Sequence, residues 1–174
     1  MEKQLSLWLD YYDDIYSDFD SRKYHKRRLS EDFVDELKAS VKHKIGEFDK
    51  LLLLLPPEQR NEQVEKEIIT SLKERFQELL AIYQQKERKI FRKGILLLLS
   101  GVLIMAINSL LIYKGYKGYI IAVLSIIMEP ASWFLVWNGL DSLVYDYRVA
   151  KNETGFYKVI GDMEICFKDI WGMK

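Results

Sequence analysis

Two long apolar runs most constrain what this chain can fold into. Residues 94–113 carry no charged side chain, and residues 119–140 carry one, Glu129. A helix of about 20 residues is about 30 Å long, which matches the hydrocarbon core of a bilayer. We therefore predict two transmembrane helices. The short, glycine-containing stretch 114–118 predicts an external loop that makes them an antiparallel hairpin.

The remainder of the chain is densely charged. The sequence contains 26 Lys+Arg and 26 Asp+Glu, so its formal net charge is zero. Because the charges are concentrated outside the two runs, we expect a water-exposed part and a membrane part rather than one mixed soluble core. A balanced charge also argues against a strongly basic nucleic-acid binder, and no nucleic-acid partner is expected.

The distribution of basic residues predicts the orientation of the hairpin. The external loop carries only Lys114 and Lys117, whereas five basic residues stand shortly before the first run: Lys86, Arg88, Lys89, Arg92 and Lys93. Cytoplasmic flanks of membrane helices are enriched in Lys and Arg. We therefore expect a multi-pass protein of the cell membrane with residues 1–93 and 141–174 in the cytoplasm.

Three intramembrane residues are candidates for function. Glu129 lies near the middle of the second run and Pro130 follows it, while Asn108 lies in the first run. A carboxyl group at that depth needs a partner, a proton or water. It could bond Asn108, Ser125 or Ser132, line the pore of an oligomer, or relay protons. Pro130 frees the carbonyl of Ile126 and allows a kink.

The cytoplasmic part is predicted to be mostly helical with a small α/β cap. A helix is expected over 58–93 and is continuous with the first span, and a good start signal predicts another over 30–44. Periodicity allows the leucine-rich segment 46–55 to be a buried strand or a short core helix. We favour the strand, because a second strand near the C-terminus needs a partner. The remaining segment, 141–174, is expected to form a helix and that short strand.

The helix over 58–93 presents a single apolar stripe that needs a partner. Leu143, Val144 and Tyr147 recur at helical spacing after the second span and offer one surface. A second copy of the protein is an equal candidate.

A charged and aromatic cluster occupies the N-terminal segment, 1–57. Hard cations prefer carboxylate oxygens, so Asp13, Asp18 and Asp20 are candidate metal ligands. Alternatively, the acidic and basic runs pair with each other. A third interpretation is contact with anionic lipid. The candidate lipid-contacting residues are Arg22, Lys23, Lys26, Arg27, Arg28, Arg88, Lys89, Arg92 and Lys93.

Catalytic constellations are not evident. The chain has one cysteine and two histidines, too few for the usual zinc sites. It contains no glycine-rich phosphate loop or nucleophile motif. We expect a protein that is not an enzyme and that needs no cofactor.

Several short motifs occur in a fixed order along the chain. They are Asp18-Phe19-Asp20, Tyr24, residues 28–33, a leucine-rich segment ending in proline, the hairpin with Glu129-Pro130, and a closing tyrosine-containing helix and strand. In this order the chain resembles a family of small prokaryotic two-span membrane proteins of uncharacterised function. The family carries proline near the Asp-Phe-Asp motif, whereas Ser21 follows Asp20 here. The family also carries a more basic helix, rich in Trp and Arg, after the second span, whereas residues 141–158 are mixed in charge here. The resemblance implies architecture and supplies no activity.

Two functions are expected on these grounds. The first is a homo-oligomeric membrane scaffold whose cytoplasmic part assembles copies or recruits a cytoplasmic protein. The second is an oligomeric ion channel or pore-type effector with Glu129 in the path, since two spans alone cannot enclose a pore.

Overall fold

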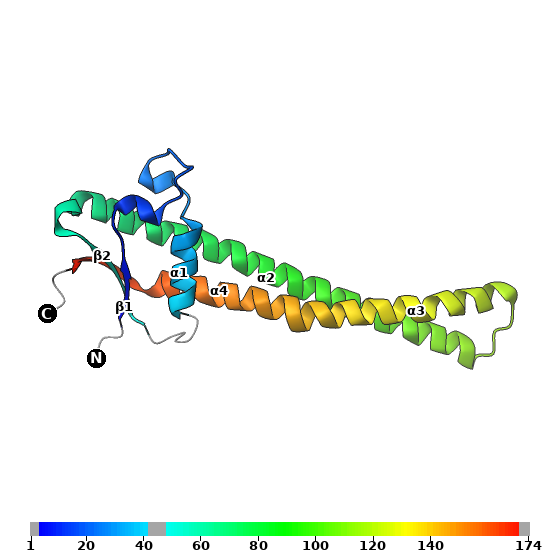
Figure 1. The fold of residues 1–174 in the computed structure, drawn as a ribbon. Helices are drawn as coiled ribbons and strands as arrows, with labels where there is room; N and C mark the ends of the chain where they lie inside the picture. Colours follow the sequence, from blue (N-terminus) through cyan, green and yellow to red (C-terminus); the bar gives the residue numbers. More distant parts are fainter. Residues whose placement is uncertain (1–3, 42–47, 171–174) are drawn as a thin grey trace. The chain divides into compact units, whose positions relative to one another are not determined.

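The computed structural model describes residues 4–41 and 48–170. The chain divides into two compact units. The α/β unit comprises Met1–Ala81 and Gly155–Lys174, and the hairpin unit comprises Ile82–Thr154. The fold is mostly helical with one small sheet, as predicted (Figure 1).

A three-stranded parallel sheet organises the α/β unit. Its strands are β1 (Gln4–Trp8), β2 (Lys50–Leu55) and β3 (Glu164–Asp169), in the order β1-β2-β3. Pairing is parallel on both sides of β2. The sequence analysis included no strand at β1 and placed that segment in the charged cluster.

The central strand explains the leucine run. All five leucines from Leu51 to Leu55 are buried, because β2 is paired on both edges and covered on both faces. The edge strands alternate instead, with Leu5 and Leu7 buried in β1, and Ile165 and Phe167 in β3. The strand predicted over 46–55 is observed from Lys50 onward, and positions 46 and 47 lie outside the described residues.

Helix α1 (Glu31–Val41) lies within the helix predicted over 30–44, of which 42–44 lie outside the described residues. Its apolar side chains Phe33, Leu37 and Val41, which recur every four residues, are buried. The short 3-10 turns η1 (Tyr12–Ile15) and η2 (Tyr24–Lys26) precede it.

Helix α2 (Glu62–Tyr113) is 52 residues long and passes Gly94 without a break. It begins four residues later than predicted, because Pro57–Gln59 forms a separate 3-10 turn, η3. Asn61 then caps α2, since its side-chain oxygen accepts the backbone N–H of Gln63 at 3.0 Å. In the α/β unit, α2 contributes the buried Ile68, Leu72 and Phe76.

The second arm of the hairpin is a succession of helices. It consists of α3 (Tyr119–Asp141), a π-helical turn η4 (Ser142–Asp146) and α4 (Tyr147–Asp162). The predicted loop 114–118 separates α2 from α3, with Gly115 at φ 66°. The π turn holds one more residue per turn than an α-helix. Leu143 faces Gly94, so the next residue, Val144, points away from the first arm and is exposed, which corrects that assignment. Tyr147 packs its ring 5.3 Å from Phe91.

Candidate functional site: the apolar hairpin and its polar residues

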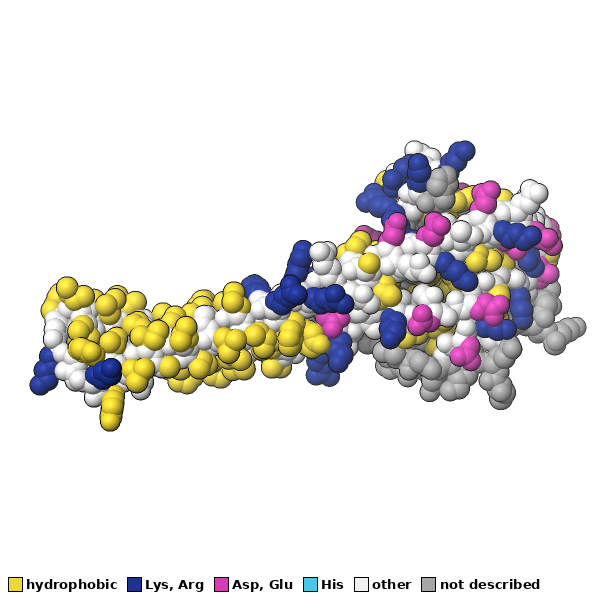
Figure 2. All heavy atoms as spheres, turned by 180° about the vertical axis from the view of Figure 1, so that it is seen from behind, with side chains coloured by type: hydrophobic (Ala, Val, Ile, Leu, Met, Phe, Trp, Pro, Cys, Tyr) yellow, Lys and Arg dark blue, Asp and Glu magenta, His cyan; other side chains and the backbone are white. Residues whose placement is uncertain are grey.

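The hairpin unit exposes apolar side chains along both arms. Two helices of the structure are long and apolar enough to cross a membrane by length and composition. Large apolar side chains such as Leu96, Leu103 and Ile126 are each at least 60 % exposed. In the face shown in Figure 2, this yellow stretch has Lys and Arg side chains gathered at its ends. A soluble protein rarely exposes so large an apolar surface.

The two arms meet along a seam of small residues. A Cβ added to Gly139 would lie 2.6 Å from the backbone nitrogen of Leu98, and one on Gly101 would lie 2.8 Å from the carbonyl oxygen of Ser132. A Cβ on Gly94 would meet Leu143 at 2.8 Å. The backbones therefore approach so closely that only small side chains fit.

The sequence analysis did not predict this seam, although the sequence carries a signal for it. Small residues recur every seven positions, at 94 and 101 on one arm and at 125, 132 and 139 on the other. Residues seven positions apart lie on the same face of a helix, so a seven-residue repeat places each of them in the contact with a neighbouring helix. Asn108 continues the repeat on the first arm.

Asn108 is the polar member of the seam. It is buried, and its side-chain oxygen accepts no hydrogen bond from any residue that the structure describes. The structure does not bring it together with Glu129, whose side chain is exposed and makes no hydrogen bond to any described residue. Gly94 faces Leu143 and Gly101 faces Val136, so the same register places Asn108 opposite Glu129. The two side chains do not pair because Asn108 is buried between the arms, whereas the Glu129 side chain is exposed.

Ser132 bonds the backbone instead of the carboxylate. Its hydroxyl donates to the carbonyl oxygen of Glu129 at 2.7 Å, three residues earlier, and the side chain is buried. Helix α3 continues through Pro130 from Tyr119 to Asp141. The lone carboxylate is left facing outward among exposed apolar neighbours such as Ile126, Ile127 and Trp133.

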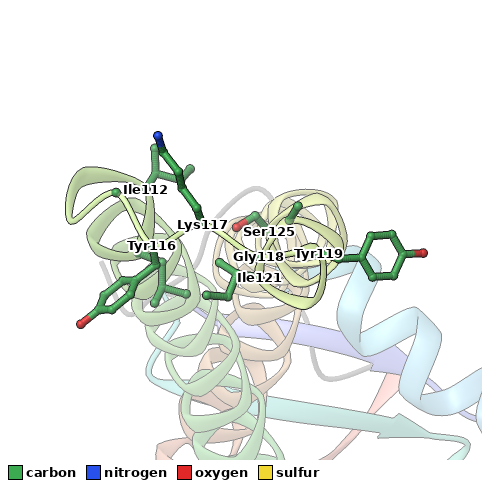
Figure 3. A pocket seen from close by; sticks show the side chains of 10 residues that line it. Ile112, Tyr116, Lys117, Gly118, Tyr119, Ile121 and Ser125 are labelled. Atoms are coloured by element: carbon green, nitrogen blue, oxygen red, sulfur yellow. The ribbon is translucent and has the colours of Figure 1, made fainter.

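The tip of the hairpin contains an open hollow of about 640 Å³. Loop residues and the adjoining ends of both helices line it, Ser125 among them. Figure 3 shows the Tyr116 and Tyr119 side chains pointing away from each other on opposite sides of the turn. The exposed lining is mainly apolar, and Lys117 is the charged residue in it.

The predicted N-terminal cluster is arranged as ion pairs. Asp20 is buried, accepts two hydrogen bonds from the Arg22 guanidinium at 2.8 and 2.7 Å, and accepts the backbone N–H of Arg28 at 2.9 Å. These hydrogen bonds lower the pKa of Asp20 well below its usual range. Asp13 pairs with Arg27.

Arg27 also stacks over aromatic rings. Its guanidinium carbon lies 5.6 Å from the centre of the Tyr16 ring and 5.9 Å from that of Tyr24. Within the part of the chain that the structure describes, no three acidic, histidine or cysteine side chains converge to hold a metal. The candidate ligands Asp13 and Asp20 are each engaged by an arginine, and Asp18 is exposed.

A second ion network in the α/β unit had no sequence signal. Arg60 donates two hydrogen bonds to the buried Glu65, both at 2.9 Å, and one to Asp169 at 2.8 Å. The hydroxyl of Tyr12 donates to Glu65 at 3.0 Å and accepts the N–H of Asn61. Arg60 lowers the pKa of Glu65, and burial raises that of Tyr12. The network joins residues up to 109 positions apart, and no local sequence motif predicts such contacts.

Other predicted basic residues are free of such pairing. Arg88 and Arg92 make no ion pair with any described residue. They lie with Glu87, Phe91 and Tyr147 around a small hollow of about 190 Å³ in the hairpin unit. Lys89 and Lys93 are exposed on the same turn-and-a-half of α2, and Lys23 and Lys26 are exposed in the α/β unit.

Comparisons with models of protein families, with curated proteins and with solved structures find no match to this chain.

Proposed function

We propose that this chain is an integral protein of the cell membrane, inserted by a hairpin of residues 94–113 and 119–140. It acts as a homo-oligomeric scaffold that presents its α/β unit in the cytoplasm, where a protein partner can be recruited. It belongs, on this proposal, with the small prokaryotic two-span membrane proteins that its motif order resembles. No enzymatic step and no cofactor form part of the proposal.

The arrangement of the sheet supports placing both flanks of the hairpin on one side. β2 precedes the hairpin and β3 follows it, yet Leu51 to Leu55 pair directly with residues 165–169. Two strands can share a sheet only if both are on the same side of the bilayer, so the chain must cross an even number of times. Five basic residues before the first run, against two in the loop, favour the cytoplasm for that side.

One observation carries the oligomer: Glu129, in the middle of residues 119–140, is exposed and makes no hydrogen bond with any described residue. A charged side chain there costs about 2.5–3.5 kcal/mol on insertion scales when it faces lipid. A second copy packed over this face of α3 removes Glu129 from lipid and gives it a hydrogen-bonding partner. The same observation favours the alternative function, an oligomeric channel in which a ring of Glu129 side chains lines the path.

Insertion and orientation are tested together by cysteine labelling. Cys166, the single natural cysteine, lies on β3, and Tyr116 lies in the loop. In spheroplasts, an impermeant maleimide should label Tyr116→Cys in a Cys166→Ser background, and should label Cys166 only after permeabilisation. Extraction of the protein from membranes by alkaline carbonate would contradict insertion.

The oligomer is tested by counting photobleaching steps in nanodiscs. The wild type should show several steps per particle. Glu129→Leu should shift the distribution toward one step, because a leucine at this position can face lipid without the cost of an exposed carboxylate. Glu129→Gln should stay oligomeric through its amide. Passage of ions by wild-type liposomes, lost in Glu129→Gln, would select the channel over the scaffold. A strictly monomeric wild type would refute both.

A further inference from the structure

We propose that the hollow bounded by Arg88, Phe91, Arg92 and Tyr147 binds the phosphate of an anionic phospholipid headgroup. The proposal rests on the proposed insertion of the hairpin. It names one specific site among the basic residues that the sequence offers. Glu87 completes the lining, and the hollow measures about 190 Å³.

The charges in the hollow suit a phosphodiester. Arg88 and Arg92 stand four residues apart on α2, so they project from the same face of the helix. Neither has an ion-pair partner among the described residues, so both guanidinium forks are available. A guanidinium group can donate two parallel hydrogen bonds to two oxygens of one phosphate, so both its charge and its geometry suit this ligand. With Glu87 the lining carries a net charge of +1, which balances one phosphodiester anion.

The depth of the hollow is that of a headgroup. Arg92 lies two residues and Arg88 six residues before Gly94, where the apolar run begins. At 1.5 Å per residue, the two side chains start about 3–9 Å outside the hydrocarbon core. The headgroup layer on each side of a bilayer is about 5–8 Å thick. On the other arm, Tyr147 lies six residues beyond Asp141, at a matching height.

An aromatic pair forms the apolar wall of the hollow. The rings of Phe91 and Tyr147 have centres 5.3 Å apart at an interplanar angle of 52°. Phe91 is 44 % exposed although it stands outside the apolar run. Tyrosine and neighbouring aromatic rings are favoured at this level, because the ring contacts acyl chain and glycerol while the hydroxyl reaches polar groups.

The hollow is smaller than the usual pocket for a whole soluble ligand. Pockets for whole small molecules usually enclose about 300–1,000 Å³ and bury most of the ligand. At about 190 Å³, this hollow fits a phosphate and its immediate ester groups. The remainder of a lipid would stay in the bilayer, alongside the exposed apolar surface of the hairpin.

The experiment compares two double variants with equal loss of charge. Arg88→Gln/Arg92→Gln removes the two forks, and Lys114→Gln/Lys117→Gln removes two cations from the opposite end of the hairpin. Native mass spectrometry of full-length protein in micelles, titrated with palmitoyl-oleoyl phosphatidylglycerol or phosphatidylcholine, gives the binding constant for each. The wild type should prefer phosphatidylglycerol. The arginine double variant should bind it about 30-fold more weakly, taking about 1 kcal/mol for each lost charge.

The loop-lysine variant should bind phosphatidylglycerol within threefold of the wild type. Arg88→Lys/Arg92→Lys should fall between the two, because lysine keeps the charge and loses the fork. Equal losses in the two glutamine variants, or none in the arginine variant, would overturn the site, leaving only general attraction. Displacement of the lipid by inorganic phosphate at equal concentration would also overturn it, in favour of a soluble anion.

A separate readout keeps the proposed function apart from this site. Each variant is tested for flotation with pure phosphatidylcholine liposomes after carbonate treatment. Flotation with loss of phosphatidylglycerol preference confirms the site. Failure of the wild type to float refutes insertion, whatever its behaviour in micelles.

Discussion

Replacing Gly139 by alanine is expected to destabilise the hairpin, whereas the same replacement at Gly155 is expected to stabilise the chain. A Cβ at position 139 would lie 2.6 Å from the nitrogen of Leu98 and 2.9 Å from the carbonyl oxygen of Gly94. Ordinary contact begins at 3.4 Å, and the atoms met are backbone, so they cannot rotate away. A Cβ at position 155 would meet nothing within 4 Å.

The pair of substitutions isolates the cost of the close approach. Both glycines lie inside helices, so both gain about 1 kcal/mol of helix propensity on becoming alanine. Only Gly139→Ala also forces the two arms apart by several tenths of an ångström. Overpacking of this kind costs about 1–3 kcal/mol. The difference in unfolding free energy between the two variants should therefore be about 1–3 kcal/mol, with Gly155→Ala the more stable.

The measurement is equilibrium unfolding in mixed micelles of dodecyl maltoside and SDS, followed by circular dichroism at 222 nm. A distance between spin labels on the two arms, measured by pulsed EPR, should lengthen in Gly139→Ala alone. If Gly139→Ala stabilises the protein as much as Gly155→Ala does, the arms are not in backbone contact and the seam is refuted.

Three further predictions concern the α/β unit and the seam. Glu65→Gln should destabilise the protein by about 1.5–3 kcal/mol at pH 7. The pKa of Glu65 is lower in the folded than in the unfolded protein. Its contribution to the free energy of unfolding is therefore present above the unfolded pKa of about 4.3 and is lost as pH falls through the folded value. The thermal unfolding of the wild type and of Glu65→Gln should then converge as pH falls below 4. Asp20→Asn should release the backbone N–H of Arg28, seen as faster hydrogen exchange there, while Asp18→Asn, at an exposed position, should leave that rate unchanged. Asn108→Leu should preserve or raise stability in micelles, since the buried amide oxygen has no partner to lose; a fall of more than about 2 kcal/mol would reveal a bond from a second copy.

The hairpin could be predicted because its signal is local. Few structures can accommodate an uncharged run of this length in a chain that is otherwise rich in charge. The loop at 114–118 is indicated by its two glycines and two lysines. The leucine run was predicted as a strand for a different reason, because the alternating segment near the C-terminus needs a strand partner. That inference used a distant segment, and the pairing of Leu51 to Leu55 with residues 165–169 confirms it.

Other features that depend on distant residues escaped prediction. Strand β1 carries a clear signal, the alternation of Leu5, Leu7 and Leu9, but the surrounding charged and aromatic residues obscured it. The bond between Arg60 and Asp169 joins the start of α2 to β3, and nothing near either residue announces the other. The exposure of Val144 follows from the contact of its neighbour Leu143 with Gly94, and the spacing of apolar residues alone does not say which of the two faces the first arm.

The order of the elements implies that the hairpin organises the sheet. β2 and β3 are adjacent in the sheet but separated by more than 100 residues, which makes their pairing costly in loop entropy if the intervening chain is free. Pairing of the two arms shortens that loop, because the contact of Phe91 with Tyr147 already joins points well along each arm. Contact between the two arms closes a loop of only five residues, 114–118. The pairing of β2 with β3 closes a loop of more than 100 residues. Pairing of the two arms should therefore lower the entropic cost of pairing β3 with β2, because it shortens the loop that this pairing closes.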